Sequence, residues 1–179
     1  NILKMLNNMA LVYNQLGEKD KAVKLYKKQL KGAAEIDDKQ MLGYAYLNMG
    51  IVFVETGRID EALECFDKQY QNAKELGEKR TIAFALGNMG VVHSERGDHI
   101  KAKKMFLEQI EISRNAGLKT ILGYAYGNLA NVLKELGNNK AAEKNFDLGL
   151  NLLRETGNQY FQSSCLYYKG VLMYDTGRV

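Results

Sequence analysis

The sequence has no proline, only two cysteines and no long apolar run. Without proline, rigid extended linkers are not expected, which argues against a multidomain layout. No uninterrupted apolar segment reaches the roughly 18 residues that a membrane-spanning helix needs, and the N-terminal residues are too polar for a signal peptide. Cys65 and Cys165 lie far apart in the chain. We therefore expect two reduced, partly buried thiols in a cytoplasmic protein that does not enter a membrane.

Motifs of catalysis and cofactor binding are also missing. The sequence holds no H-E-x-x-H metal motif, no C-x-x-C pair and no phosphate-binding loop, and its two histidines are His93 and His99. Metal binding and nucleophilic catalysis therefore have no group of residues to work with. We predict a protein that is not an enzyme and that needs no cofactor or metal.

The charge of the chain gives little support for a nucleic-acid partner. The 25 basic and 21 acidic side chains leave a net charge of +4, which is modest for 179 residues. Lysines gather between residues 19 and 31 and between 101 and 104, and an RNA-binding helical array would use such a stripe. Acidic residues such as Glu61, Glu64 and Glu143 interrupt it elsewhere. A solvated outer face is the favoured interpretation, and RNA binding stays open as an alternative.

One stretch returns every 40 residues along the chain. Residues 83–98 read AFALGNMGVVHSERGD, and related stretches begin at positions 3, 43, 123 and 163. A fixed period of this size is typical of an array of stacked structural repeats. We predict one array over residues 1–179, with repeats at 3–42, 43–82, 83–122 and 123–162 and part of a fifth at 163–179.

Each repeat is predicted to hold two antiparallel helices. Apolar residues recur with helical spacing, as at Tyr46, Met49, Gly50 and Phe53. A glycine ends most segments, and glycine adopts the left-handed conformation of a helix C-terminus without strain. The predicted first helices are 1–16, 41–56, 80–96, 119–136 and 159–176, and the predicted second helices are 19–36, 59–76, 99–116 and 139–156.

Three columns of residues are predicted to hold the two helices of a repeat together. Small residues allow a close approach, and a large ring beside them fills the remaining space. The small columns are Ala10, Gly50, Gly90 and Ala130 on the first helix and Ala22, Ala62, Ala102 and Ala142 on the second, and the ring column is Tyr26, Phe66, Phe106 and Phe146. After the turn come Asp20, Asp60, Asp98 and Asn138, whose side-chain oxygens suit the start of the second helix.

These columns resemble the tetratricopeptide repeat, whose signature places a large residue, a Leu-Gly pair and a tyrosine on the first helix and A-x3-F on the second. The second repeat carries it as Met49, Gly50 and Phe53, followed by Ala62 and Phe66. The resemblance implies an all-α, right-handed superhelical solenoid of antiparallel helix pairs, with four repeats and half of a fifth. The family's usual period is about 34 residues, and the longer period is similar to that of Pins-type scaffolds and bacterial regulators.

In tetratricopeptide arrays the first helices line a concave groove that holds ligands, so the resemblance implies a binding site here. Its predicted floor is apolar and aromatic, with amides beside it and a row of carboxylates toward the helix ends. The three groups are Tyr44, Phe84, Tyr124, Leu47, Ile51 and Val91; Asn48, Asn88, Asn128 and Asn131; and Glu55, Glu95 and Glu135. Such a surface suits a partner peptide with apolar anchors and some basic residues.

The column of Asn48, Asn88 and Asn128 has a specific predicted role. The three residues occupy equivalent turns of successive first helices, which stack roughly 10 Å apart as packed helices do. An extended peptide rises ~3.3 Å per residue, so the amides would meet its backbone about every third residue. Two alternatives stay open, namely that each asparagine bonds a neighbouring helix and that the groove aromatics pack between repeats.

Both histidines have structural interpretations. His93 shares its column with Tyr13, Phe53 and Leu133, so we expect a packed helix residue. His99 lies at the turn between two predicted helices, where we expect it to be exposed. Neither position favours a base or a metal ligand.

The main functional hypothesis is a scaffold or adaptor whose groove binds a partner peptide or helix. The alternative is a regulatory or sensor segment of a larger signalling protein. Both ends of the sequence align with the interior of a repeat, so we expect a fragment of a longer array. Arrays normally carry polar capping repeats, and uncapped ends are expected to associate end to end.

Overall fold

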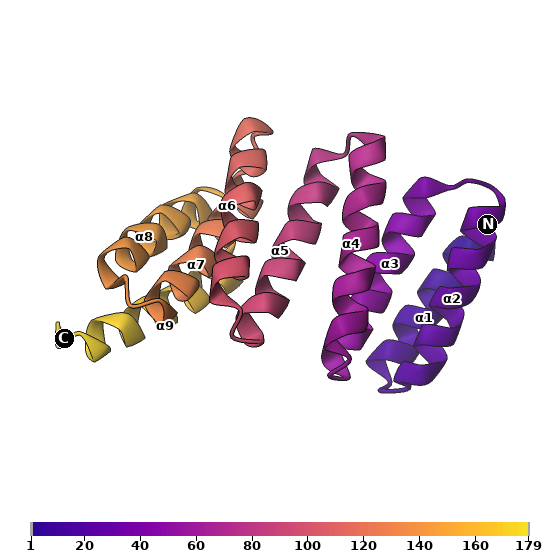
Figure 1. Ribbon diagram of the computed structural model, residues 1–179, viewed down its shortest axis with the longest axis horizontal. Helices are drawn as coiled ribbons and strands as arrows, with labels where there is room; N and C mark the ends of the chain where they lie inside the picture. Colours follow the sequence, from indigo (N-terminus) through magenta and orange to yellow (C-terminus); the bar gives the residue numbers. More distant parts are fainter. Residues whose placement is uncertain (1, 179) are drawn as a thin grey trace. The chain divides into compact units, whose positions relative to one another are not determined.

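The computed structural model describes residues 2–178, and these residues form nine α-helices without a strand (Figure 1). The helices are α1 (Ile2–Gln15), α2 (Lys19–Glu35), α3 (Lys39–Glu55), α4 (Ile59–Leu76), α5 (Lys79–Glu95), α6 (His99–Asn115), α7 (Lys119–Glu135), α8 (Asn139–Glu155) and α9 (Gln159–Asp175). Each bound lies within two residues of the one expected from the sequence. The prediction of an all-α chain of helix pairs is confirmed.

A residue with positive φ lies in every turn between consecutive helices. It is a glycine, such as Gly57 with φ of 72°, in all of these turns except the second, where Asp37 has φ of 51°. After Gly57 the N–H of Arg58 donates to the carbonyl oxygen of Phe53 at 2.8 Å, which satisfies a carbonyl that the helix leaves free. Aspartate tolerates the left-handed region better than most side chains, which explains how Asp37 replaces glycine.

The residues predicted to cap the second helices are only partly right. Asp20 and Asp60 are not caps, because α2 and α4 already begin two residues after the turn glycine. Both carboxylates lie in the first helical turn, where they face the positive end of the helix dipole. Asn138 does cap α8, and its Oδ1 accepts the backbone N–H of Ala141 at 3.2 Å.

The chain divides into two compact units between Ala85 and Leu86, within α5. In the first unit Gly50 lets α3 approach α4, since a Cβ atom at Gly50 would lie 2.6 Å from a ring carbon of Phe66. The second unit repeats this arrangement at Gly90, where a Cβ would lie 2.6 Å from the Phe106 ring. The small and ring columns therefore pack as the sequence predicts.

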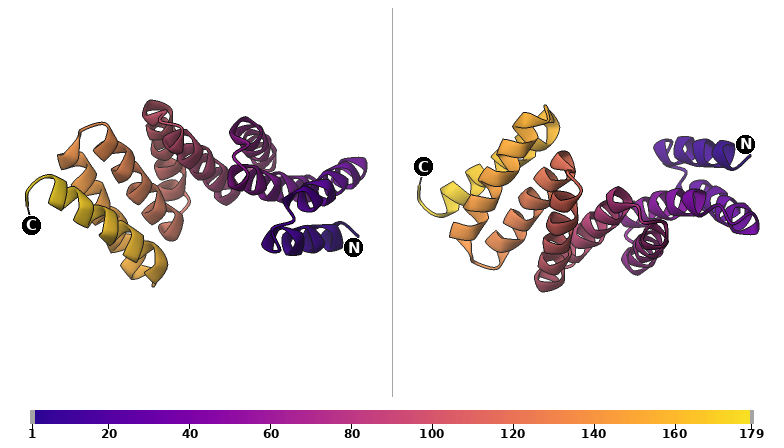
Figure 2. Two further views of the ribbon diagram at one scale, coloured as in Figure 1. Left: turned by 90° about the horizontal axis from the view of Figure 1, so that it is seen from below. Right: turned by 90° about the horizontal axis from the view of Figure 1, so that it is seen from above.

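The helices α7, α8 and α9 lie side by side in both views of Figure 2 and share the core of the second unit. Leu129, Phe146 and Leu153 are buried in this core together with Cys165. Both cysteines are free and buried, and burial raises the pKa of the Cys65 thiol to about 11. Between residues 2 and 178, no helix combines the length and the hydropathy of a membrane span.

Candidate peptide-binding recesses

The first unit contains a recess of about 220 Å³ between α3, α4 and the start of α5. We call it the first recess. Its walls include three of the predicted groove residues, Tyr44, Leu47 and Phe84, together with Leu76. Tyr44 is 49% exposed and Phe84 is 40% exposed, so both rings remain accessible. The recess is an apolar slot between two aromatic side chains.

A buried amide lies at the base of the first recess. Gln69 is only 2% exposed, and its Oε1 has no hydrogen-bond partner in the described part of the chain. Nearby, Gly43 allows α4 to come close, since a Cβ there would lie 3.3 Å from Nδ2 of Asn72. That Nδ2 donates to the carbonyl oxygen of Lys39, which ties α4 to the first turn of α3. The lining of the first recess is therefore mainly apolar, and it also includes the buried amide of Gln69 and charged side chains such as Glu78 and Arg80.

The second unit contains a recess of about 380 Å³, which we call the second recess. It brings together five residues predicted for the groove, which come from α5 and α7: Val91, Glu95, Asn128, Asn131 and Glu135. These five residues line one depression, and their role in ligand binding stays a prediction.

The lining of the second recess combines apolar surface from residues such as Val91 and Phe106 with several polar and charged side chains. Lys134 Nζ lies 3.2 Å from Glu135 Oε1, so these two charges compensate one another. Within residues 2–178, Glu95 makes no ion pair. The Oδ1 of Asn131 and the Nδ1 of His99 are buried without a hydrogen-bond partner in the described chain. The recess thus carries an excess of acceptors and one uncompensated negative charge.

Five of the predicted groove residues line neither recess, namely Tyr124, which is described below, and four others. Asn48 donates from Nδ2 to Oδ1 of Asn7 at 2.9 Å, and Glu55 forms an ion pair with Lys19. Ile51 is 38% exposed. The fourth, Asn88, lies partly buried on the second-unit part of α5. The contact of Asn48 matches the alternative in which an asparagine bonds a neighbouring helix.

Tyr124 is engaged between helices. Its ring lies 3.8 Å, centroid to centroid, from the ring of Phe161 on α9, and its hydroxyl accepts from Nδ2 of Asn158 at 2.6 Å. Burial raises the pKa of the Tyr124 hydroxyl, and the hydrogen bond from Asn158 opposes this rise. At this position the aromatic packs between repeats, whereas Tyr44 in the same column stays exposed.

Several recess residues were missed by the sequence interpretation. His99 was expected to be exposed, but it is partly buried and lines the second recess, where Ser94, Lys134 and Tyr168 join it. Gln69 was missed at the base of the first recess. A signal for Gln69 was present, because glutamine recurs at positions 29, 69 and 109, and all three are buried. For His99, the position next to a turn gave no sign of its burial.

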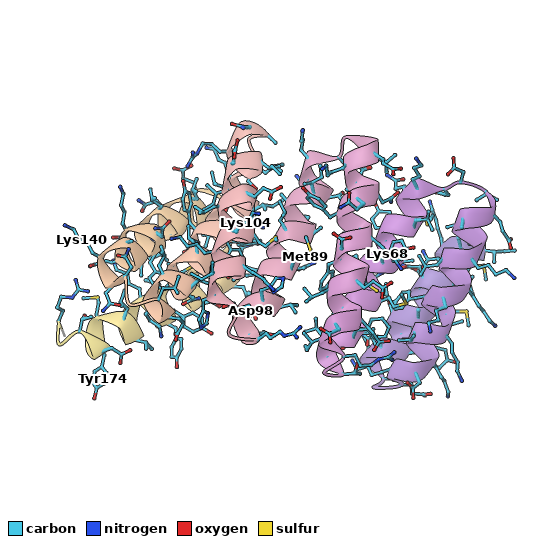
Figure 3. The ribbon with its side chains drawn as sticks, viewed as in Figure 1. Lys68, Met89, Asp98, Lys104, Lys140 and Tyr174 are labelled. Carbon is cyan, nitrogen blue, oxygen red and sulfur yellow. The ribbon has the colours of Figure 1, made fainter. Side chains whose placement is uncertain are left out.

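Most of the lysines expected on an outer face are solvent-exposed, whereas Lys19 and Lys103 are partly buried. Lys104 on α6 and Lys140 on α8 are exposed, and Figure 3 shows Lys140 projecting away from its helix. Lys68 pairs with Glu64 at 2.6 Å, so acidic neighbours offset part of this charge. The arrangement agrees with a solvated face.

The sequence was compared with models of known families. The model of the tetratricopeptide repeat matches residues 1–75, 41–115 and 81–155. The chain belongs to the tetratricopeptide repeat family. A comparison of this tetratricopeptide repeat chain with curated proteins gives no match.

Solved structures support the same fold for the tetratricopeptide repeat chain. It matches aspartyl phosphate phosphatase F from Bacillus subtilis with a TM-score of 0.88 at 15% identity, over 96% of this chain and 45% of that one. It matches a signal transduction ATPase with a tetratricopeptide repeat sensor from Pyrococcus horikoshii with a TM-score of 0.86 at 18% identity. This match covers 96% of the present chain and 27% of the ATPase. For BtubC from P. vanneervenii the TM-score is 0.77 at 21% identity, and the match covers 87% of the present chain and 65% of BtubC. The chain therefore spans less than two thirds of each of these proteins, and the likeness concerns the fold.

Proposed function

We propose that the chain is a non-enzymatic scaffold or adaptor that binds a partner peptide or helix. The binding surface would include the first recess in the first unit and the second recess in the second unit. The observation that carries the proposal is the second recess, where five residues chosen from the sequence as ligand-binding line one depression. Tetratricopeptide repeats generally serve protein binding, which supports the same conclusion.

An extended peptide segment suits the amides of the asparagine column within each unit. Asn88 and Asn128 occupy equivalent positions of α5 and α7, and each amide can donate to a peptide carbonyl and accept from a peptide N–H. Asn48 uses one N–H for Asn7 and keeps a second N–H and its carbonyl oxygen for a ligand. In the second unit the amides of Asn88 and Asn128 would bind a peptide backbone, and in the first unit the apolar part of the first recess would hold a side-chain anchor.

The experiment begins with a pull-down and mass spectrometry to identify the partner of the full-length parent protein. Asn88 and Asn128 are then changed together to Ala, and both the affinity for that partner and the melting temperature are measured. We expect a loss of ~1–3 kcal/mol in binding, because groups of the bound peptide are left unpaired. A matched control changes the exposed Asn115 and Asn151 together to Ala.

The two outcomes separate ligand binding from a structural role. Binding that falls while melting stays near that of the control supports the groove. A sharp fall in melting temperature, with normal binding by the protein that remains folded, would show that the asparagine column serves the fold and would overturn the proposal.

A regulatory or sensor role is the second candidate. It is supported by the likeness to a signal transduction ATPase that carries a tetratricopeptide repeat sensor. A catalytic or DNA-binding domain in the parent protein would favour this role, so the full-length sequence decides between the two. We also propose a cytoplasmic location, which imaging of the tagged parent protein would check. RNA binding is tested by a gel-shift assay at low and moderate salt, since phosphate contacts weaken as salt rises.

We further propose weak end-to-end self-association through α1 and α9. Both helices expose large apolar side chains, including Ile2 at 74%, Met5 at 63% and Tyr174 at 76%, and Figure 3 shows Tyr174 projecting away from α9. Light scattering over a concentration series is the test. A strict monomer at millimolar protein concentration contradicts the proposal.

A further inference from the structure

We propose that the second recess receives a guanidinium group, the side-chain end of an arginine in the partner. This inference rests on the proposed function and names the chemistry of one contact within it. It is drawn from charge, from buried acceptors that lack partners, and from the way this recess departs from the repeat pattern.

The charge of the recess selects a cation. Lys134 and Glu135 form an ion pair at 3.2 Å, so their two charges cancel in the net charge of the recess. Glu95 has no ion-pair partner among the described residues, so it leaves one negative charge at the recess. An anionic group placed there would be repelled by this carboxylate, whereas a cation would be attracted.

Asn131 gives an independent reason to expect a ligand. Its column reads Leu11, Ile51, Val91, Asn131 and Val171, so four aliphatic residues show that the fold itself does not need an amide there. The Oδ1 of Asn131 is buried and has no partner among residues 2–178. An unpaired buried acceptor lowers stability, because the group loses its hydrogen bonds to water and gains none in the protein. A hydrogen-bond donor supplied by a partner would compensate this loss.

A guanidinium matches the group of acceptors better than an ammonium does. Oxygen acceptors come from Glu95, Asn128 and Asn131, which lie on two helices around the recess. Guanidinium offers five N–H donors in a fixed plane and no acceptor, so it can serve several of these oxygens at once. An ammonium is a compact, strongly hydrated charge with three donors. A recess of about 380 Å³ also has room for a planar group.

The test is an NMR titration of the isotope-labelled protein at physiological salt. The probe is the acetylated and amidated peptide Ala-Ala-Arg-Ala-Ala. Matched peptides carry citrulline, which keeps the shape and loses the charge, or lysine, or glutamate in place of arginine. We expect saturable shifts of the side-chain amides of Asn128 and Asn131 with arginine. The citrulline peptide is expected to bind at least about tenfold more weakly, because a charge-assisted hydrogen bond is lost.

Two variants and one control place the contact. Glu95→Gln and Asn131→Val are each expected to weaken arginine binding by roughly tenfold. Valine is native to the Asn131 column, so this variant keeps the fold, which its melting temperature verifies. The control is Glu155→Gln, because Glu155 is an exposed carboxylate of the second unit that lies outside the recess and pairs with Lys119. This variant is expected to bind the arginine peptide as the wild type does.

Three results would overturn the inference. They are equal binding of the arginine and citrulline peptides, equal or tighter binding of the lysine peptide, and wild-type affinity in folded Glu95→Gln. These outcomes leave the proposed function standing if the Asn88 and Asn128 double variant still loses its partner. The opposite combination is also informative. If the partner binds the double variant normally and the arginine peptide still binds at the second recess, the proposed role of the asparagine column is refuted and the guanidinium contact is supported.

Discussion

Repeat two and repeat four share one framework, yet their helix pairs meet differently. In repeat two, Gln69 on α4 lies at the base of an open recess beside Ala73. The corresponding residues of repeat four are Gly149 and Leu153 on α8. A Cβ atom on Gly149 would lie 2.9 Å from the carbonyl oxygen of Gly123 on α7, so the two backbones are in close contact. The space that stays open in repeat two is closed in repeat four.

The difference shows that two positions of the second helix control whether a recess exists. Leu153 is fully buried, and a Cβ on Gly123 would lie 2.9 Å from its Cγ, so this leucine fills the interface. Ala73 is too small to do so. The columns that define the family, such as Phe66 and Phe146, are buried in both repeats. Ligand-sized space can therefore change while the repeat framework is kept.

The largest expected effect comes from Leu153→Ala, which places at repeat four the residue that repeat two has. The truncation leaves a cavity at a fully buried site, so we expect a loss of ~2–5 kcal/mol in the free energy of unfolding. Chemical denaturation measures it. Leu166→Ala on α9, where the leucine is 49% exposed, serves as the control and should change stability by less than about 0.5 kcal/mol. Equal losses in both variants would show that Leu153 does not fill the interface.

Gly149→Gln tests the close backbone contact of repeat four. A Cβ would lie 2.9 Å from the oxygen of Gly123 and 3.2 Å from the nitrogen of Gly127, so α8 must move away from α7. We expect destabilisation of ~1–3 kcal/mol, measured by thermal unfolding. Gly170→Ala is the matched control, because a Cβ there meets nothing within 4 Å, and it should stabilise α9 by up to ~1 kcal/mol. A glutamine variant as stable as the wild type would refute the close contact.

Asn131→Val sharpens the comparison between Asn131 in repeat four and Ile51 in repeat two. Removing a buried acceptor that lacks a partner should raise the free energy of unfolding by ~1 kcal/mol. Asn151→Val at an exposed site of α8 is the control and should bring no gain. If denaturation shows both variants to be equally stable, Asn131 carries no unpaired group in solution.

The smallest effect concerns pH, because repeat two has Cys65 where repeat four has Asn145. Burial raises the pKa of Cys65 from its ordinary value of 9.0 to about 11. A raised pKa means that stability is fully present below pH 9.0 and is lost as the pH rises toward about 11. Cys65→Ala should therefore show a shallower fall of stability across this window, measured by denaturation at several pH values. Identical slopes in the two proteins would contradict the prediction.

The fold could be predicted because each repeat restates the same columns. Helical spacing and turn glycines located the helices, and the small residues facing Phe66 and Phe106 indicated how each pair packs. Five residues of the second recess were also found, since a helix face is set by residue spacing. The starts of α2 and α4 were located correctly, but the capping role given to Asp20 and Asp60 was wrong, because a cap depends on where the preceding turn closes, which a single aspartate does not reveal.

The remaining parts of the site depend on neighbours one repeat away. Tyr44 and Tyr124 occupy the same column of the repeat. The ring of Tyr124 packs against the ring of Phe161, whereas the residue equivalent to Phe161 two repeats earlier, near Tyr44, is Thr81. The exposure of an aromatic is therefore decided by a contact between repeats rather than by its own column. His99 likewise became a recess residue through packing, which no pattern in one helix encodes.

The packing of consecutive helices within each unit also bears on how the chain reaches its native state. In the first unit α1 packs on α2, α2 on α3 and α3 on α4, and in the second unit α6 packs on α7, α7 on α8 and α8 on α9. Chains dominated by contacts between sequence neighbours fold quickly, because little loop-closure entropy is lost before contacts form. The chain also has no proline, so it lacks the slow isomerisation of X–Pro bonds. Helix pairs can form early and recruit their neighbours one at a time.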